Sequence, residues 1–252
     1  MTPIRSAALA AIAMAAPLAG AGITTFDFEG LAHGEIVNTQ YAPLLTVSAV
    51  NPNRGHDIAA AFDTSLIGTL DPDLEGPPGG GGSLAISQTE TQLGRALIIA
   101  ENAVGAGDGI LDNPDDEGSR PAGQLILQFS RTINTFGFDV IDIEGIILEG
   151  SSLEFFRDDV LVATVEFADF TTVASDFYDA TIVFGDNTAN RVAPISASAL
   201  VSAGFASASD GFDRVVINVG GSSAFDNIII PAPSGLLAFA GGWLMLSRRR
   251  RA

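Results

Sequence analysis

Three groups of acidic residues have the types and spacing that could hold a metal ion. The first consists of Asp71, Asp73 and Glu75, at alternate positions and followed by glycine. Alternate carboxylates in a tight turn can converge on one hard cation, and this spacing is that of the first half of a calcium loop, D-x-D-x-D-G. A twelve-residue calcium loop ends in Glu, whereas position 82 is glycine. The segment is therefore not an EF-hand, and we interpret it as a partial calcium cage or as an acidic turn.

The second group is the run Asp115, Asp116 and Glu117, with Asp112 shortly before it. Three consecutive carboxylates repel one another unless water or a cation neutralises them. Two interpretations stay open for this group, a solvated turn and a second part of a calcium site.

The third group consists of one acid near the start and one near the end of the segment 22–230, which contains all the acidic residues of the chain. Glu29 belongs to an opening D-F-E, and Asp226 to a closing D-N-I. These ends resemble those of jelly-roll, lectin-like and carbohydrate-binding modules, in which the first and last strands lie side by side and a Glu and an Asp flank a structural calcium ion. The resemblance implies that Glu29 and Asp226 are calcium ligands, together with backbone carbonyls. The alternative is a turn at Asp226 and an exposed Glu29.

Catalytic signatures are absent from the sequence. His33 and His56 are the two histidines, and the chain has no H-E-x-x-H, G-x-S-x-G or P-loop motif. Thirty acidic residues guarantee some carboxylate pairs at glycosidase distances by chance, so pairing alone is no evidence. We predict a protein that is not an enzyme; the alternative is a secreted polysaccharide hydrolase that uses a carboxylate pair.

The charge distribution narrows the classes of partner. The chain has 252 residues and no lysine. The segment from Gly22 to Ile230 contains seven arginines and all 30 acidic residues, so its net charge is −23. So negative a surface repels phosphate backbones, which excludes nucleic-acid binding and suits cation binding or solubility.

Cysteine is absent, so no disulfide or thiolate chemistry exists. Tyr41, Tyr178 and Trp243 are the only large polar aromatics, which argues against a sugar site built on stacking.

Short apolar or alternating runs separated by Gly, Asp, Asn and Ser predict strands rather than helices. Two acids, Asp158 and Asp159, stand between β-rich runs and indicate a hairpin turn. We predict an all-β fold, a two-sheet antiparallel β-sandwich of the jelly-roll type, formed by residues 22–230 as one domain. The predicted strands are Thr24–Glu29, Leu44–Ala49, Ala59–Asp63, Ala96–Ala100, Gln124–Phe129, Thr135–Ile141, Ser152–Arg157, Val160–Phe167, Ala180–Phe184, Arg214–Val219 and Asn227–Ile230.

The first 21 residues have the pattern of a secretory signal peptide. Arg5 precedes an apolar run, and small residues lead up to Ala21, after which we predict cleavage of a signal helix by signal peptidase. The alternative is a buried N-terminal helix.

The last residues, 231–252, combine three features in order: Pro231 and Pro233, a short apolar run, and Arg248, Arg249, Arg250 and Arg251. The apolar run is shorter than the roughly 20 residues of a spanning helix, and the arginines would stay on the cytoplasmic side of a membrane. This tail resembles the PEP-CTERM sorting signal, although Ala232 replaces the usual Glu. The resemblance implies a short C-terminal helix in contact with the membrane and processing by an exosortase-like enzyme. An ordinary tail anchor is the alternative.

Together these features predict an exported acidic β-sandwich that binds Ca²⁺. We expect it at the cell surface, at the outer membrane or in the extracellular matrix, with a structural or glycan-binding role in extracellular polysaccharide.

Overall fold

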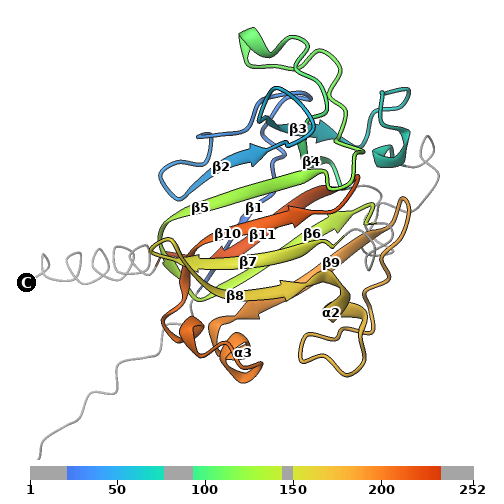
Figure 1. The fold of residues 1–252 in the computed structure, drawn as a ribbon. Coiled ribbons are helices and arrows are strands. Elements are labelled where there is room, and N and C mark those ends of the chain that lie inside the picture. Colours follow the sequence, from blue (N-terminus) through green and yellow to red (C-terminus); the bar gives the residue numbers. More distant parts are fainter. Residues whose placement is uncertain (1–21, 77–92, 144–149, 234–252) are drawn as a thin grey trace, which may run out of the picture. The chain divides into compact units, whose positions relative to one another are not determined.

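The computed structural model describes residues 22–76, 93–143 and 150–233. Residues Ile23–Pro231 form one compact unit. Its strands form two antiparallel sheets packed face to face (Figure 1). The predicted two-sheet antiparallel β-sandwich is therefore confirmed.

Six strands form sheet I and five form sheet II. Sheet I has the order β3-β4-β11-β6-β9, and β1 also pairs with β11. Its strands are β1 (Ile23–Phe26), β3 (Ala59–Asp63), β4 (Arg95–Ile99), β6 (Thr135–Ile141), β9 (Ala189–Ser196) and β11 (Ala224–Pro231). Sheet II has the order β2-β5-β10-β7-β8. Its strands are β2 (Leu45–Val50), β5 (Gly123–Ile133), β7 (Ser152–Arg157), β8 (Val160–Glu166) and β10 (Phe212–Val219).

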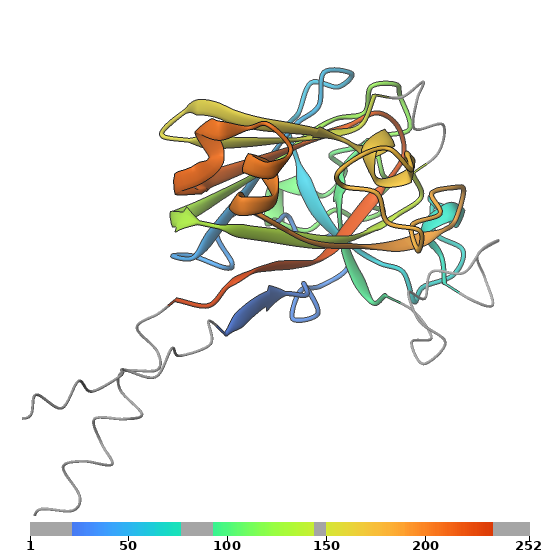
Figure 2. The same cartoon turned by 90° about the horizontal axis from the view of Figure 1, so that it is seen from below.

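The first and last strands are neighbours, as the resemblance to jelly-roll modules implied. β1 runs antiparallel to the end of β11, with Ile23 opposite Pro231 and Phe26 opposite Ile228 (Figure 2). The start of β11 pairs instead with β4. β11 thus brings the beginning and the end of the domain together in the middle of sheet I.

The main hydrophobic core lies between the sheets and follows from strand alternation. In β5, Leu125, Leu127 and Phe129 are buried, whereas Gln128 and Ser130 between and after them are exposed. Side chains alternate across a strand, so this pattern places one face of β5 in the core. Phenylalanines fill much of this core, in pairs such as Phe155 and Phe212, whose ring centroids are 4.8 Å apart.

A second, smaller core covers the outer face of sheet I. Every residue of β3 is buried, so solvent reaches neither face of that strand. Ala60 and Phe62 of β3 and Ile98 of β4 cluster with Leu74 and Leu111. Leu74 and Leu111 belong to connections outside the strands. Two loops therefore cover sheet I, and these loops carry the first two acidic groups.

The hairpin prediction is confirmed at Asp158 and Asp159, which join β7 to β8 with φ values of 50° and 64°, as in a type I′ turn.

The strand predicted at Ala180–Phe184 is wrong. That segment is a loop whose Ile182 and Phe184 pack on the core, which explains its apolar pattern. The strand lies later, at β9, an edge strand that tolerates Pro194.

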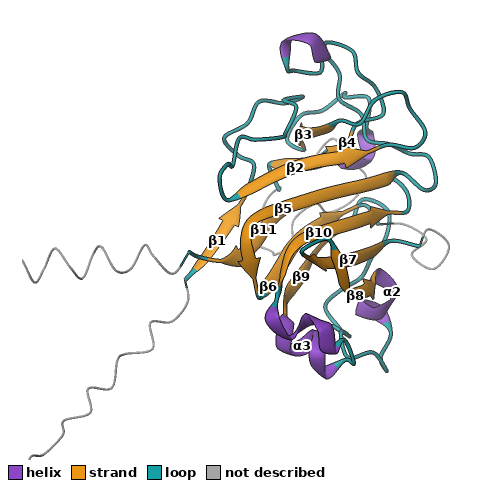
Figure 3. Ribbon diagram, turned by 60° about the vertical axis from the view of Figure 1, so that its left-hand side comes forward, coloured by secondary structure: helices purple, strands orange, loops and turns teal. Residues whose placement is uncertain are grey.

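The helices are short and lie beside β8 and β9 or within loops (Figure 3). They are the α-helices α2 (Phe167–Thr171) and α3 (Ala197–Ser202) and the 3₁₀ turns η1 (Pro72–Leu74), η2 (Ala106–Asp108) and η3 (Ala206–Asp210). Within the described ranges no helix has the length and apolarity to cross a bilayer. The predicted signal helix at 1–21 and the apolar run and four arginines of the tail lie outside the described residues.

Neighbouring phenylalanines on β7 provide a test of the sheet assignment. Phe155 is fully buried between the sheets, whereas Phe156 points outward and carries the Arg214 guanidinium 4.4 Å from its ring centroid. We expect Phe155→Ala to lower the free energy of unfolding by about 3–5 kcal/mol. Phe156→Ala should cost only about 1 kcal/mol. Urea denaturation measures both, and equal losses would contradict the placement of β7.

Candidate metal centre

Three carboxylates from two separate loops converge at the edge of the second core. Asp71, Asp115 and Asp116 each offer one oxygen atom, and these atoms lie within 4.8 Å of one another. Asp71 comes from the first acidic group of the sequence and the other two from the second. The two groups therefore form one site, which we call the acidic triad.

Asp71 is held by the turn that it begins. It is the N-cap of η1, and its Oδ1 atom accepts a hydrogen bond from the backbone N–H of Leu74 at 3.3 Å. Leu74 is fully buried in the second core and anchors the turn. The residue is only 4% exposed, and its Oδ2 atom is buried without a hydrogen-bond partner among the residues that the structure describes. A buried carboxylate oxygen without a donor is costly, so this atom indicates a site for a proton or a cation.

Asp116 is positioned by a short piece of sheet. Residues 115–117 pair with residues 99–101 at the end of β4 through two backbone hydrogen bonds of 2.9 Å. The Oδ2 atom of Asp116 accepts hydrogen bonds from the Ser222 hydroxyl at 2.9 Å and from the Ser223 backbone N–H at 2.5 Å. Sequence reasoning missed both serines, because only the fold brings the turn before β11 to this loop.

Burial makes all three acids harder to ionise. It raises the pKa of Asp71 and of Asp116. The negative charge of Asp71 raises the pKa of Asp116 further, as does the hydrogen bond that the two carboxyl groups form when they share a proton, and the same hydrogen bond lowers the pKa of Asp71. Burial also raises the pKa of Asp115 to about 6, with contributions from the charges of Asp71, Glu101 and Glu117. Arg54 acts in the opposite direction on Asp115. The triad therefore favours a bound proton or a bound cation at neutral pH.

Other members of the same sequence groups have different positions. Asp73 and Asp112 are exposed. Glu75 is buried, but its Oε1 atom accepts hydrogen bonds from the backbone N–H and the hydroxyl of Thr69, at 2.6 and 2.8 Å. Glu75 therefore closes its own loop and is not a member of the triad.

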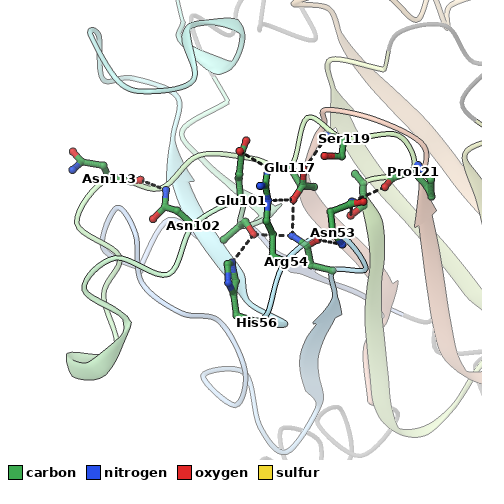
Figure 4. A network of polar contacts seen from close by, with 12 residues as sticks. Asn53, Arg54, His56, Glu101, Asn102, Asn113, Glu117, Ser119 and Pro121 are labelled. Carbon is green, nitrogen blue, oxygen red and sulfur yellow. Dashed lines mark hydrogen bonds and ion pairs between the residues drawn. The ribbon is translucent and has the colours of Figure 1, made fainter.

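Glu117 belongs to an ion-pair network with Arg54 and Glu101 (Figure 4). Its Oε2 atom accepts hydrogen bonds from Arg54 at 2.8 Å and from Asn51 at 2.9 Å, and Arg54 also pairs with Glu101. Burial alone would raise the pKa of Glu117, but hydrogen bonds from Ser119, Arg54 and Asn51 lower it to about 2. Glu117 is thus a charged anchor that fixes the loop carrying Asp115 and Asp116.

Asp226 lies in a second buried acidic region, on β11. The side-chain amide of Asn227 donates to Oδ2 of Asp226 and to Oδ2 of Asp139, both at 2.8 Å. Arg191 holds Asp139 through two hydrogen bonds of 2.8 Å. The Oδ1 atom of Asp226 is buried, and no described residue forms a hydrogen bond with it. Burial raises the pKa of Asp226 to about 9, with contributions from the charges of Asp139, Glu29 and Asp27.

Glu29 belongs to the same region but is exposed. Its Oε1 atom accepts a hydrogen bond from the Arg95 backbone N–H at 2.8 Å, and its carboxylate lies over Gly94, where a Cβ would overlap it. The charge of Glu29 contributes to the raised pKa of Asp226, and the pairing of the two residues as calcium ligands stays a prediction. Asp27 and Asp139 are further acids of this region that spacing alone did not indicate.

Comparison with known proteins finds little. No family model matches the chain, and no curated protein sequence matches it. Among solved structures, the K2 cleaved adhesin domain of Lys-gingipain is similar at 12% sequence identity and a TM-score of 0.37, over 83% of this chain and 99% of that one. The similarity is remote, and the sites described above rest on this chain's own residues.

The raised pKa values predict how stability depends on pH. The Asp115 carboxyl has a folded-state pKa of about 6 and an ordinary value of 3.8, so its contribution is fully present below pH 3.8 and is lost as the pH rises through about 6. Because Asp115 is partly exposed, this loss is on the order of 1 kcal/mol. We expect the melting temperature in EDTA to fall over this window, and Asp115→Asn to flatten the fall. A metal-free melting temperature that rises across this window would contradict the assignment.

Proposed function

We propose that the chain is an exported, non-catalytic β-sandwich protein that binds Ca²⁺ and works at the cell surface or in the extracellular matrix. The observation that carries the calcium assignment is the unpartnered, buried Oδ2 atom of Asp71, beside Asp115 and Asp116. A cation at this position would satisfy that oxygen and remove the repulsion among the three carboxylates.

The chemistry of the ligand atoms favours calcium over other metals. All three side chains offer carboxylate oxygens, which hard cations prefer, whereas zinc sites use Cys and His. The chain has no cysteine. Calcium accepts six to eight oxygen ligands in flexible geometry, so backbone carbonyls and water would complete the shell. Asp226 and Glu29 are the proposed ligands of a second ion, between the first and last strands as in jelly-roll modules.

Export and sorting are proposed from the two ends of the sequence. Signal peptidase would remove residues 1–21, and an exosortase-like enzyme would process the tail that begins at Pro231 and Pro233. The apolar run and arginines 248–251 would hold the chain briefly in the membrane. The mature domain would then act in the extracellular polysaccharide, as a structural or a glycan-binding component.

Calcium should stabilise the protein through the acidic triad. At a calcium concentration about 100 times the dissociation constant, binding adds about 2.7 kcal/mol to the free energy of unfolding. For a domain of this size that corresponds to a rise in melting temperature of about 5–10 °C. Calorimetry in millimolar calcium and in EDTA measures this rise.

Substitution of Asp116 separates this account from a general effect of calcium on an acidic protein. Asp116→Asn replaces a buried acid by a neutral amide of the same shape, so we expect an unchanged or higher melting temperature in EDTA and a strongly reduced calcium response. Asp73→Asn is the matched control, because Asp73 is an exposed acid of the other loop of the site, the one that carries Asp71. An equal calcium response in wild type and Asp116→Asn would refute the triad as the site.

A further inference from the structure

A groove of about 200 Å³ lies beside the edge strand β9. The segment after α2, including Phe177 and Tyr178, forms one wall, and Pro194 and Ile195 of β9 form another. Ile182 also lines the groove and is buried. The buried part of the groove lining is therefore apolar, and none of the lining residues belongs to the acidic triad or to the group around Asp226.

Tyr178 is the tyrosine available to a ligand. Tyr41 is fixed edge-on against Phe26 and Phe28, with ring centroids 5.3 and 5.5 Å away, whereas Tyr178 is 40% exposed at the groove. The backbone N–H of Tyr178 donates to the carbonyl of Ser175 at 3.3 Å. This hydrogen bond restrains the backbone of the wall, and such restraint lowers the entropic cost of binding.

Two carboxylates give the groove a negative charge. Asp176 is exposed, and Asp179 accepts hydrogen bonds from the Thr181 backbone N–H at 2.8 Å and hydroxyl at 2.6 Å. Because these bonds favour the charged form, they lower the pKa of Asp179. An aromatic ring beside carboxylates is a favourable setting for a cation.

We propose that this groove binds one protonated amino-sugar unit of a polysaccharide. The apolar depth would contact the C–H face of the pyranose, while the ammonium group would lie against Tyr178 and the carboxylates of Asp176 and Asp179. A volume of about 200 Å³ is below the range of roughly 300–1,000 Å³ for drug-sized ligands and suits a single ring. The inference rests on the glycan-binding part of the proposed function and is independent of the calcium site.

A lysine side chain of a peptide offers the same charge but fits less well. Ordering a lysine side chain costs up to about 2 kcal/mol of conformational entropy, a cost that a rigid pyranose ring avoids. Lysine also presents a narrow chain rather than a flat face to the apolar wall formed by Pro194 and Ile195. The groove therefore favours the saccharide.

Calorimetric titration of the full-length protein with glucosamine oligomers, slightly below neutral pH and in calcium, tests the proposal. We expect binding that Tyr178→Ala weakens about tenfold and Tyr178→Phe leaves within about twofold, because the ring remains. Asp176→Asn should weaken binding about threefold, whereas Asp73→Asn, an exposed acid elsewhere, should not. Far-UV circular dichroism confirms that each variant is folded.

Several results would overturn the proposal. These are equal binding of N-acetylglucosamine oligomers, tighter binding of oligolysine, no effect of Tyr178→Ala, or an equal loss in Asp73→Asn. The calcium-induced rise in melting temperature is recorded on the same samples. Amino-sugar binding without that rise would support the groove and reject the calcium site. A rise in melting temperature without amino-sugar binding would reject the groove alone.

Discussion

Asp71 and Asp116 meet where two loops close over the outer face of sheet I, and burying their charges is the constraint on which this end of the sandwich depends. The loops must cover the second core, because Phe62 and Ile98 would otherwise face water. Covering it brings the two carboxylates together out of solvent, and an uncompensated buried charge costs several kcal/mol. Hydrogen bonds from Ser222 and Ser223 to Asp116 offset part of this cost, but Oδ2 of Asp71 has no donor within the described part of the chain.

A proton and a cation are the two ways to complete this arrangement, and they have opposite consequences. A shared proton makes the closed loops most stable in acid. A calcium ion would hold them closed at neutral pH and would link their stability to the calcium concentration. The loop that carries Asp115 and Asp116 favours the calcium ion over the shared proton. Glu117 is fixed by Arg54 and Asn51 and thereby holds Asp115 and Asp116 in place before any ion binds. The buried carboxyl group of Asp226 on β11 likewise requires a proton or a cation.

Sequence patterns predicted the strands well where one face alternates, as in β2 and β5, and at the Asp158–Asp159 turn. They failed at β9, where Pro194 interrupts the pattern, and at Ala180–Phe184, where a loop packs apolar side chains on the core. Spacing identified every member of the triad but could not show that Asp71 joins Asp115 and Asp116 across more than 40 positions of sequence. Nor could it separate them from Asp73 and Asp112, because local spacing is the same whether a carboxylate faces solvent or another loop.

A crystal structure of the protein grown in calcium tests the central claim most directly. We predict a strong density peak bound by oxygens of Asp71, Asp115 and Asp116, at the roughly 2.3–2.6 Å typical of calcium. The peak should have the anomalous signal of calcium and should disappear from crystals treated with EDTA. Asp71 and Asp116 oxygens in direct hydrogen-bond contact, with no ion between them in millimolar calcium, would contradict the account and assign the site to a shared proton.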